Sequence, residues 1–275
     1  MKKVLITGAA GDVGGHLRRE LAGRYHLRLS DIRPIAELAP GEEFIRGDCA
    51  SLRDMLRVTR GVDAIVHLGG FSVEGPWEVI LRANIVGAYQ VFEAARRNGV
   101  RRMVFATSNH AVGFYDRDKT IDHRVTPRPD SRYGVSKVFG EALASLYADK
   151  YGMEMFCMRI GNVNPVPIDK RRLSILFTPR DLAQLVTIGI EHPGIRFEIV
   201  YGVSRNKRSW YDNANAYRLG YKPQDDSEVF AADILRRELP GDATAELYQG
   251  GVFAVAEDIP NPAPLPKKRA GKKKK

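Results

Sequence analysis

Residues 3–14 read KVLITGAAGDVG, an apolar run that leads directly into three glycines spaced G-x-x-G-x-x-G. The run Lys3–Thr7 predicts a buried strand, and residues 14–23 predict a helix. Glycines at such a strand-to-helix turn let the backbone approach a pyrophosphate, which binds the free N–H groups at the start of the helix. We therefore predict a dinucleotide-binding loop. Its expected cofactor contacts are Gly8, Ala10, Gly11, Asp12, Val13 and Gly14.

An acidic residue lies where such a loop needs one. The second predicted strand, residues 27–30, ends at Asp31, which is 17 residues beyond Gly14. A carboxylate at this point takes the adenosine ribose hydroxyls and repels a 2′-phosphate, so the predicted cofactor is NAD rather than NADP. Arg33, two residues later, is the one feature that favours the phosphate. Ile32, beside the acid, is expected to contact the cofactor.

Further cofactor contacts are expected where later strands end. Asp48 follows the third predicted strand, residues 43–46, and is either a hydrogen-bonding partner of the adenine edge or a cap for a helix starting near Ala50. The sequence leaves these two readings open. The other expected contacts of this kind are Cys49, Leu68, Gly69 and Ile160.

The same alternation of short apolar runs and helix-period stretches continues along the chain. Strands are predicted at 64–68, 102–107, 154–159 and 197–201, and helices at 77–98, 131–152, 179–191 and 228–237. This pattern is typical of an α/β fold, a Rossmann-like doubly wound parallel sheet. We expect an NAD-binding domain over 1–160 and, over 161–259, a small C-terminal substrate lobe with some elements returning to the Rossmann core. Residues 260–275 are predicted to form a disordered basic tail.

Charge placement argues against a nucleic-acid protein. The chain has 275 residues and a net charge of +10, but residues 267–275 alone carry seven of those charges. The remaining +3 is ordinary for a soluble surface, so we expect neither a specific nucleic-acid partner nor a membrane. No apolar run approaches the ~18 residues of a membrane span. Two cysteines, Cys49 and Cys157, are too few for a disulfide framework, and we expect a cytoplasmic protein with no metal.

A tyrosine and a lysine lie four residues apart near the start of the helix predicted at 131–152. Tyr133 and Lys137 therefore share one helix face. An ammonium group beside a phenol favours the phenolate, so Tyr133 is expected to act as acid and base on a substrate hydroxyl. Ser108, at the end of the strand predicted at 102–107, is placed to hydrogen-bond the same oxygen. Asn84, on the helix 77–98, is a candidate for holding a water near Lys137; capping or packing is the alternative.

These motifs resemble those of a known superfamily. TGAAGDVG, NIVG, the strand-end serine and YGVSK are together similar to the extended short-chain dehydrogenase/reductases over residues 2–161. A closer resemblance, to bacterial uronate dehydrogenases, lies in HLGGFSVE (67–74), TSNH (107–110), RIG (159–161) and QGGVF (249–253). It implies oxidation of the anomeric carbon of glucuronate or galacturonate with NAD to an aldarolactone, with Ser108, Tyr133 and Lys137 as the catalytic residues.

The resemblance also implies a sugar pocket. Arg171 would pair with the uronate carboxylate, as a guanidinium does bidentately, although Arg172 is the alternative. Phe253 would close the pocket. The chain departs from the family at two positions. Asn162 replaces a serine of those enzymes, and Leu176 replaces a tryptophan. Both positions fall in regions expected to line the sugar pocket. The full set of expected substrate contacts is Ser72, Ser108, Asn109, His110, Tyr133, Asn162, Arg171 and Phe253.

Three other activities use similar motifs. One is dehydrogenation of another aldose or a sugar phosphate, and a second is epimerisation or dehydration of a nucleotide sugar. Nucleotide-sugar enzymes usually need a larger C-terminal domain than remains here, and the dehydratases carry acids where this chain has Asn109 and His110. The third is a binding module, either a dinucleotide sensor, a class that tends to lose the Tyr133–Lys137 pair, or a polyanion binder that uses the basic tail. By analogy, a homo-oligomer is expected, associating through the helices that carry Asn84 and Tyr133.

Overall fold

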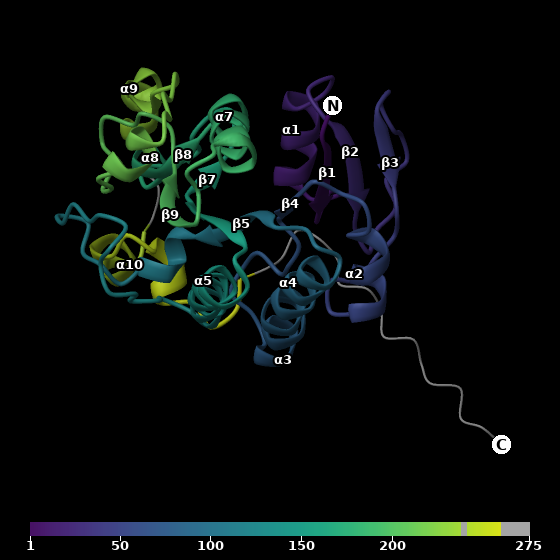
Figure 1. Cartoon of the computed structure of the whole chain (residues 1–275). Helices are drawn as coiled ribbons and strands as arrows, with labels where there is room; N and C mark the ends of the chain where they lie inside the picture. Colours follow the sequence, from purple (N-terminus) through teal and green to yellow (C-terminus); the bar gives the residue numbers. More distant parts are fainter. Residues whose placement is uncertain (238–240, 260–275) are drawn as a thin grey trace.

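Seven parallel strands form one sheet at the centre of the molecule (Figure 1). The computed structural model describes residues 1–237 and 241–259. The strand order is β3-β2-β1-β4-β5-β6-β9. Their bounds are β1 Lys3–Thr7, β2 His26–Ser30, β3 Glu42–Phe44, β4 Ala64–His67, β5 Arg102–Ser108, β6 Glu154–Ile160 and β9 Phe197–Gly202. The predicted Rossmann-like α/β fold is therefore confirmed.

The strand order reverses between β1 and β4. The chain runs outward from β1 through β2 to β3, then returns to β4 on the other side of β1 and continues outward to β9. Both strands are buried along their length, because helices cover the two faces of the sheet. Ligands of open parallel sheets bind outside the carboxyl ends of the strands at such a reversal. The loops after β1, β4 and β5 all lie at this edge.

Helices form a layer on each side of the sheet (Figure 1). Helices α1 (Asp12–Glu20) and α7 (Pro179–Glu191) pack together on one face, while α2 (Leu52–Val58), α4 (Gly87–Arg97) and α5 (Arg132–Tyr151) cover the other. Two apolar core clusters correspond to these two faces. Helix α5 begins at Ser131, whose side chain accepts a hydrogen bond from Gly134 N, and ends at Gly152 with φ +65°.

The long helix predicted at 77–98 is not a uniform α-helix. Its first turn is α3 (Trp77–Ile80), followed by a π-helical turn, η1 (Leu81–Val86), and only then α4. A π-turn inserts one extra residue into the repeat, and such turns are frequent at functional sites. The sequence period could not show it, because the apolar face continues on both sides of the turn. The insertion leaves Asn84 buried.

The C-terminal part contains short elements that the sequence pattern did not predict. Their bounds are β7 Asn162–Val163, α6 Arg172–Ile175, β8 Leu176–Phe177, α8 Ala214–Arg218, α10 Ala243–Leu247 and the 3₁₀ turn η4 Gly251–Ala254. A further unpredicted 3₁₀ turn, η2 Asn109–Val112, follows β5. The helix predicted at 228–237 is a 3₁₀ turn, η3 (Ser227–Phe230), followed by α9 (Ala231–Leu235). Strand β9 pairs with β6. The tail predicted over 260–275 lies outside the described residues.

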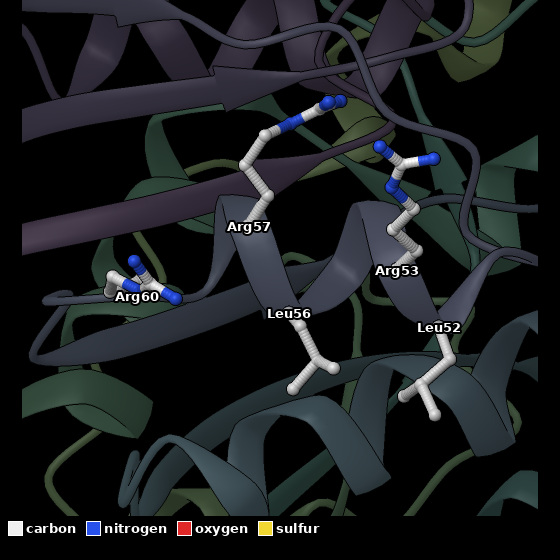
Figure 2. A pocket seen from close by; sticks show the side chains of 5 residues that line it. All are labelled: Leu52, Arg53, Leu56, Arg57 and Arg60. Carbon is white, nitrogen blue, oxygen red and sulfur yellow. The ribbon is translucent and has the colours of Figure 1, made fainter.

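Helix α2 is amphipathic, with apolar side chains on one side and basic side chains on the other. Figure 2 shows Leu52 and Leu56 pointing away from Arg53 and Arg57, and both leucines pack against the core cluster that contains α4. With Arg60 these side chains line a surface hollow of about 550 Å³. None of the predicted site residues lies in this hollow. Within 1–237 and 241–259, we find no helix long and apolar enough to cross a membrane.

Candidate active site

The loop between β1 and α1 has the shape that a pyrophosphate needs. Gly8 adopts φ +69°, and a Cβ there would come within 2.8 Å of Gly69 N. A Cβ on Gly14 would come within 2.6 Å of Gly8 O. Gly11, the N-cap of α1, offers no side chain to cap the helix. The first N–H groups of α1 therefore face the strand reversal without a side-chain acceptor, an arrangement that fits a dinucleotide phosphate.

Asp31 is held at the end of β2 by this loop. Its carboxylate accepts hydrogen bonds from Ala10 N (3.1 Å) and Arg33 N (2.9 Å). The Arg33 guanidinium donates to Ala10 O at 2.8 Å, and its Nε lies 3.7 Å from Asp31. Arg33 is thus already paired with a carbonyl and a carboxylate. This geometry favours ribose hydroxyls over a 2′-phosphate at Asp31. Ile32 follows directly, and its carbonyl accepts from Arg46 Nε.

Asp48 is not a helix cap, so that alternative was wrong. The N-cap of α2 is Ser51, whose side chain accepts from Asp54 N. Asp48 instead accepts from Ala50 N at 2.9 Å, an Asx turn that brings the chain into the helix, and from Arg82 at 2.5 Å. Its contact with adenine stays a prediction.

The other predicted cofactor residues lie at the ends of neighbouring strands. Cys49 lies against Gly69, since a Cβ on that glycine would meet its sulfur at 2.6 Å. Leu68 N donates to Thr7 O at 3.2 Å, which joins the end of β4 to β1. Ile160 is the last residue of β6 and belongs to the same carboxyl edge.

Ser108, Tyr133 and Lys137 come together at the end of β5. Tyr133 and Lys137 lie on the first turns of α5, and all three residues are buried. Lys137 Nζ lies 5.4 Å from the centre of the Tyr133 ring and donates to Ala106 O at 2.9 Å. Ser108 lies close enough to the Tyr133 hydroxyl to influence its pKa. The three side chains therefore form one group, as the sequence predicted.

The expected charge balance of this group differs from the structure. Burial raises the pKa of Tyr133 to about 12 and lowers the pKa of Lys137 to about 8. We expected the ammonium to lower the tyrosine pKa, but Lys137 makes its hydrogen bond to Ala106 O, and desolvation disfavours the charged form of both groups. Ser108 acts against this rise in the tyrosine pKa.

Asn84 holds a loop of the site. Its amide oxygen accepts from Phe71 N (2.7 Å), and its amide nitrogen donates to Phe71 O (3.0 Å) and to Ser136 Oγ (2.9 Å). The structure thus gives Asn84 the packing role that was the alternative. Both amide hydrogens are used, and a water near Lys137 stays a prediction.

Arg171 is a guanidinium without an acidic partner. Its Nε donates to Gln249 O at 2.8 Å, and its Nη2 donates to the Asn109 amide oxygen at 2.9 Å when that amide is oriented to satisfy both of its atoms. In that orientation Asn109 also donates to Ile160 O. Among the described residues, no carboxylate oxygen lies within 4.0 Å of Arg171. Burial lowers its pKa to about 10. Arg172, the alternative, is paired with Asp169.

Two aromatic rings lie beside Tyr133. His110, in η2, stacks on Phe253 with ring centres 3.7 Å apart, and Phe253 lies 5.9 Å from the Tyr133 ring. Phe253 belongs to residues 250–259, which we call the strap, because this segment crosses from Gly113 to Glu74 over the start of α5. Gly250 N donates to Gly113 O, and Ile259 N donates to Glu74 O.

The remaining predicted substrate contacts differ in exposure. Ser72 is exposed in the loop after β4. Asn162 lies in β7, and its amide oxygen is buried with no hydrogen-bond partner in the described chain. Leu176 is fully buried in β8, so it does not line an open pocket as expected.

The sequence reasoning missed two residues that hold the catalytic helix. Glu74 is buried and accepts from Tyr133 N at 2.8 Å, and it is also paired with Arg132. The Arg132 guanidinium in turn donates to Glu257 O of the strap. The signal was an acid ending the HLGGFSVE run, but its partner lies 58 residues away. No group of three or more His, Cys, Asp or Glu side chains suited to a metal lies within the described ranges.

Comparison with known proteins places the chain among enzymes. Residues 4–166 match the NAD dependent epimerase/dehydratase family. A uronate dehydrogenase of Pseudomonas putida is 47% identical over 92% of this chain and 96% of its own length. Another from Agrobacterium fabrum is 42% identical over 92% of this chain and 97% of its own.

Solved structures agree with these sequence matches. Glucuronic acid dehydrogenase from Chromohalobacter salexigens has a TM-score of 0.89 at 43% identity, covering 93% of this chain and 97% of its own. Uronate dehydrogenase from Agrobacterium tumefaciens has a TM-score of 0.88 at 42% identity, covering 92% and 97%, and a variant of it has been solved with NAD. This chain therefore belongs to the NAD dependent epimerase/dehydratase family and, within it, to the uronate dehydrogenases.

Proposed function

We propose that this enzyme oxidises the anomeric carbon of a free hexuronate, glucuronate or galacturonate, to an aldarolactone with NAD as acceptor. The observation that carries the substrate class is the half-buried Arg171 guanidinium, which has no acidic partner among the described residues. A buried charge without a counter-ion is costly, and a substrate carboxylate would supply that counter-ion. Arg171 contacts Asn109, whose neighbour Ser108 touches Tyr133, so an acid bound at Arg171 lies close to the catalytic group.

We propose the following roles for the catalytic residues. NAD, when bound, accepts the hydride from C1. Tyr133 removes the proton of the anomeric hydroxyl, and Ser108 orients that hydroxyl by hydrogen bonding. Lys137 binds the nicotinamide ribose. The structure supports this assignment through the close grouping of Ser108 and Tyr133 and through the burial that excludes water from both.

The cofactor contacts remain those proposed from the sequence. The β1–α1 loop would hold the pyrophosphate, and Asp31 would hold the adenosine ribose. Asp48, Cys49, Leu68, Gly69 and Ile160 would complete the site along the strand ends. The tight packing of Gly8 on Gly69 supports this placement, because it leaves no room for side chains in the loop.

A panel of substrates tests the substrate class. NADH formation is measured with glucuronate, galacturonate, neutral aldoses and sugar phosphates, for the wild type and for the Arg171→Gln and Arg172→Gln variants. We expect the uronates to be the best substrates and Arg171→Gln to lower kcat/KM for them roughly 100-fold, as the loss of a buried charge pair does. Arg172→Gln is the matched control and should change little. A best substrate without a carboxylate would contradict the proposal.

Tyr133→Phe tests the mechanism separately. Loss of a general acid–base group lowers turnover by roughly 10²–10⁴-fold. NAD affinity, measured by quenching of intrinsic fluorescence, should stay within about twofold, because the phenol ring remains in place. Turnover at the wild-type rate in this variant would show that another group removes the proton.

We propose that residues 161–259 mainly form the substrate lobe and that 1–160 form the NAD-binding domain. Arg171 and Phe253 both come from the C-terminal part, while β9 of the same part completes the sheet. We also propose a cytoplasmic location, which the two free cysteines, Cys49 and Cys157, support.

We propose a homo-oligomer that associates through the α4/α5 face. This face consists of large apolar side chains of α3, η1, α4 and α5 that are 37–48% exposed. They are Trp77, Leu81, Tyr89, Val135, Leu146 and Tyr151. Large apolar side chains left exposed on neighbouring helices support such an association.

A further inference from the structure

Asp130 is a buried carboxylate directly before the catalytic helix. Its side chain has no exposed surface. One oxygen accepts a hydrogen bond from Ser131 Oγ at 2.7 Å, and the other lies 2.7 Å from Nδ1 of His110. The backbone of the same two residues is also joined, since Asp130 N donates to His110 O at 3.3 Å. The carboxylate is therefore aimed at one atom of one ring.

The surrounding backbone leaves Asp130 no other position. A Cβ on Gly113 would come within 1.7 Å of Asp130 Oδ2, and a Cβ on Gly250 within 1.9 Å. Neither glycine has a positive φ, so these two positions exclude a side chain by contact alone. Two chain segments far apart in sequence thus pack closely against the oxygen that faces His110.

The His110 ring has one nitrogen committed and one free. Nδ1 faces a carboxylate, which only accepts hydrogen bonds, so Nδ1 carries the proton. Among the described residues, no partner hydrogen-bonds Nε2. Burial lowers the pKa of His110, although Asp130 acts in the opposite direction, so the ring is neutral and Nε2 keeps its lone pair. The ring stacks on Phe253 and lies 5.8 Å from the Tyr133 ring.

We propose that Asp130 is a positioning residue, which fixes His110 in the tautomer with its proton on Nδ1 and so leaves Nε2 as a hydrogen-bond acceptor for a hydroxyl group of the bound sugar. This inference rests on the proposed function, in which His110 contacts the substrate. The guanidinium of Arg171 and the ammonium of Lys137 are donors only. Nε2 of His110 is an acceptor beside them, and it selects for a sugar that presents a hydroxyl there.

The tautomer can be measured without any substrate. The full-length protein with bound NAD is labelled with ¹⁵N-histidine, and the ring nitrogens are assigned by long-range ¹H–¹⁵N correlation. Of the six histidines, His110 is identified by its absence in His110→Gln. We expect a protonated Nδ1 and an unprotonated Nε2 in the wild type. In Asp130→Ala the proton should move to Nε2, the form that an unconstrained imidazole prefers. A proton on Nε2 in the wild type, or no change in the variant, would overturn the proposal.

Steady-state kinetics then test whether Nε2 of His110 accepts a hydrogen bond from the sugar. In Asp130→Ala, KM for the uronate should rise roughly tenfold, the equivalent of one neutral hydrogen bond, with a smaller change in kcat. The deoxy-uronate that lacks the hydroxyl bound by Nε2 should show the same roughly tenfold rise in KM with the wild-type enzyme. With Asp130→Ala its KM should not rise further. Asp118→Asn, an exposed acid in the same connection with a side chain 74% exposed, is the matched control. If Asp130→Ala raises KM further for every deoxy-uronate, Nε2 of His110 does not contact a sugar hydroxyl and this part of the proposal is wrong.

The two readouts separate this inference from the proposed function. A wild type that turns over no uronate but shows the expected histidine tautomer would contradict the function and leave the Asp130–His110 geometry standing. A uronate dehydrogenase whose His110 carries its proton on Nε2 would contradict only the role of Asp130. Thermal melting of each variant shows whether the fold is kept.

Discussion

At the scale of single residues, the catalytic group is defined by burial rather than by a pairwise charge effect. Tyr133 and Lys137 were identifiable from their spacing of four, because that spacing places them on one helix face. The protonation states of Tyr133 and Lys137 could not be predicted from the sequence, because they depend on the strands packed against that face. Lys137 is 7% exposed, and within residues 1–237 and 241–259 its side chain hydrogen-bonds only Ala106 O.

This burial predicts a stability effect of Lys137→Met. The pKa of Lys137 is lowered from 10.5 to about 8 by burial, so between these pH values the unfolded chain binds a proton that the folded chain does not. Stability therefore rises with pH across this window, and below pH 8 the full cost of the buried charge is present. At pH 7, Lys137→Met should therefore be more stable relative to wild type than it is at high pH. Its free energy of unfolding minus that of the wild type should fall by on the order of 3 kcal/mol between pH 7 and pH 10.5.

Urea unfolding at pH 7 and pH 10.5 measures this difference. Lys150→Met, an exposed lysine of the same helix, is the control and should show no such change. A relative stability of Lys137→Met that is the same at both pH values would contradict the burial of a charged lysine. Turnover should be lost in this variant, which keeps the stability effect distinct from activity.

Among site residues, the sequence located those next to regular elements and missed those that act across the fold. Ser108 and Asp31 follow from strand ends. Asp130 and Glu74 do not, because their partners are placed by the tertiary fold. The choice between Arg171 and Arg172 also needed the structure, since only a contact with Asp169 distinguishes them.

At the scale of elements, the strap controls the sugar end of the site. It contributes Phe253, and it is fixed at Gly250 by contact with Gly113 and Asp130. It also reaches the catalytic helix through the bond from Arg132 to Glu257 O. The sequence marked QGGVF as part of the site but could not show its path, because a segment of 3₁₀ turn and irregular backbone has no period.

Gly250→Ala tests this fixation. The new methyl group would overlap Asp130 Oδ2, so the strap must shift and Phe253 must leave the His110 ring. We expect KM for the uronate to rise about tenfold, with Tm lowered by roughly 2–4 °C for each 1 kcal/mol that the contact costs. Gly241→Ala, where the nearest atom is a flexible glutamate oxygen at 3.4 Å, is the control. Unchanged KM in Gly250→Ala would show that the strap does not position Phe253.

At the scale of the whole molecule, the parallel sheet could be predicted almost strand by strand. Buried parallel strands are continuous apolar runs, and seven such runs were identified, with bounds that differ by a few residues at most. The C-terminal lobe was not predictable in this way. Its strands β7 and β8 are two residues long, and no period can be read from two residues.

The α4/α5 face predicts a measurable oligomer. Leu146 is 48% exposed on α5, and a charge there would be buried against a second copy. We expect the wild type to be at least a dimer by light scattering and Leu146→Glu to be smaller. Val229→Glu, at a residue 78% exposed outside this face, is the control. A wild-type monomer at micromolar concentration would contradict the proposed association.

The position of the strap along the chain has a consequence for how the enzyme is made. The nucleotide loop lies within the first 14 residues and the catalytic helix ends at Tyr151, whereas Phe253 lies 102 residues beyond that helix. Synthesis runs from the N-terminus, so a nascent chain on the ribosome assembles its cofactor loop first and receives the cover of its sugar pocket last. A chain whose synthesis stops before the strap therefore lacks the Phe253 ring that lies over Tyr133 and His110.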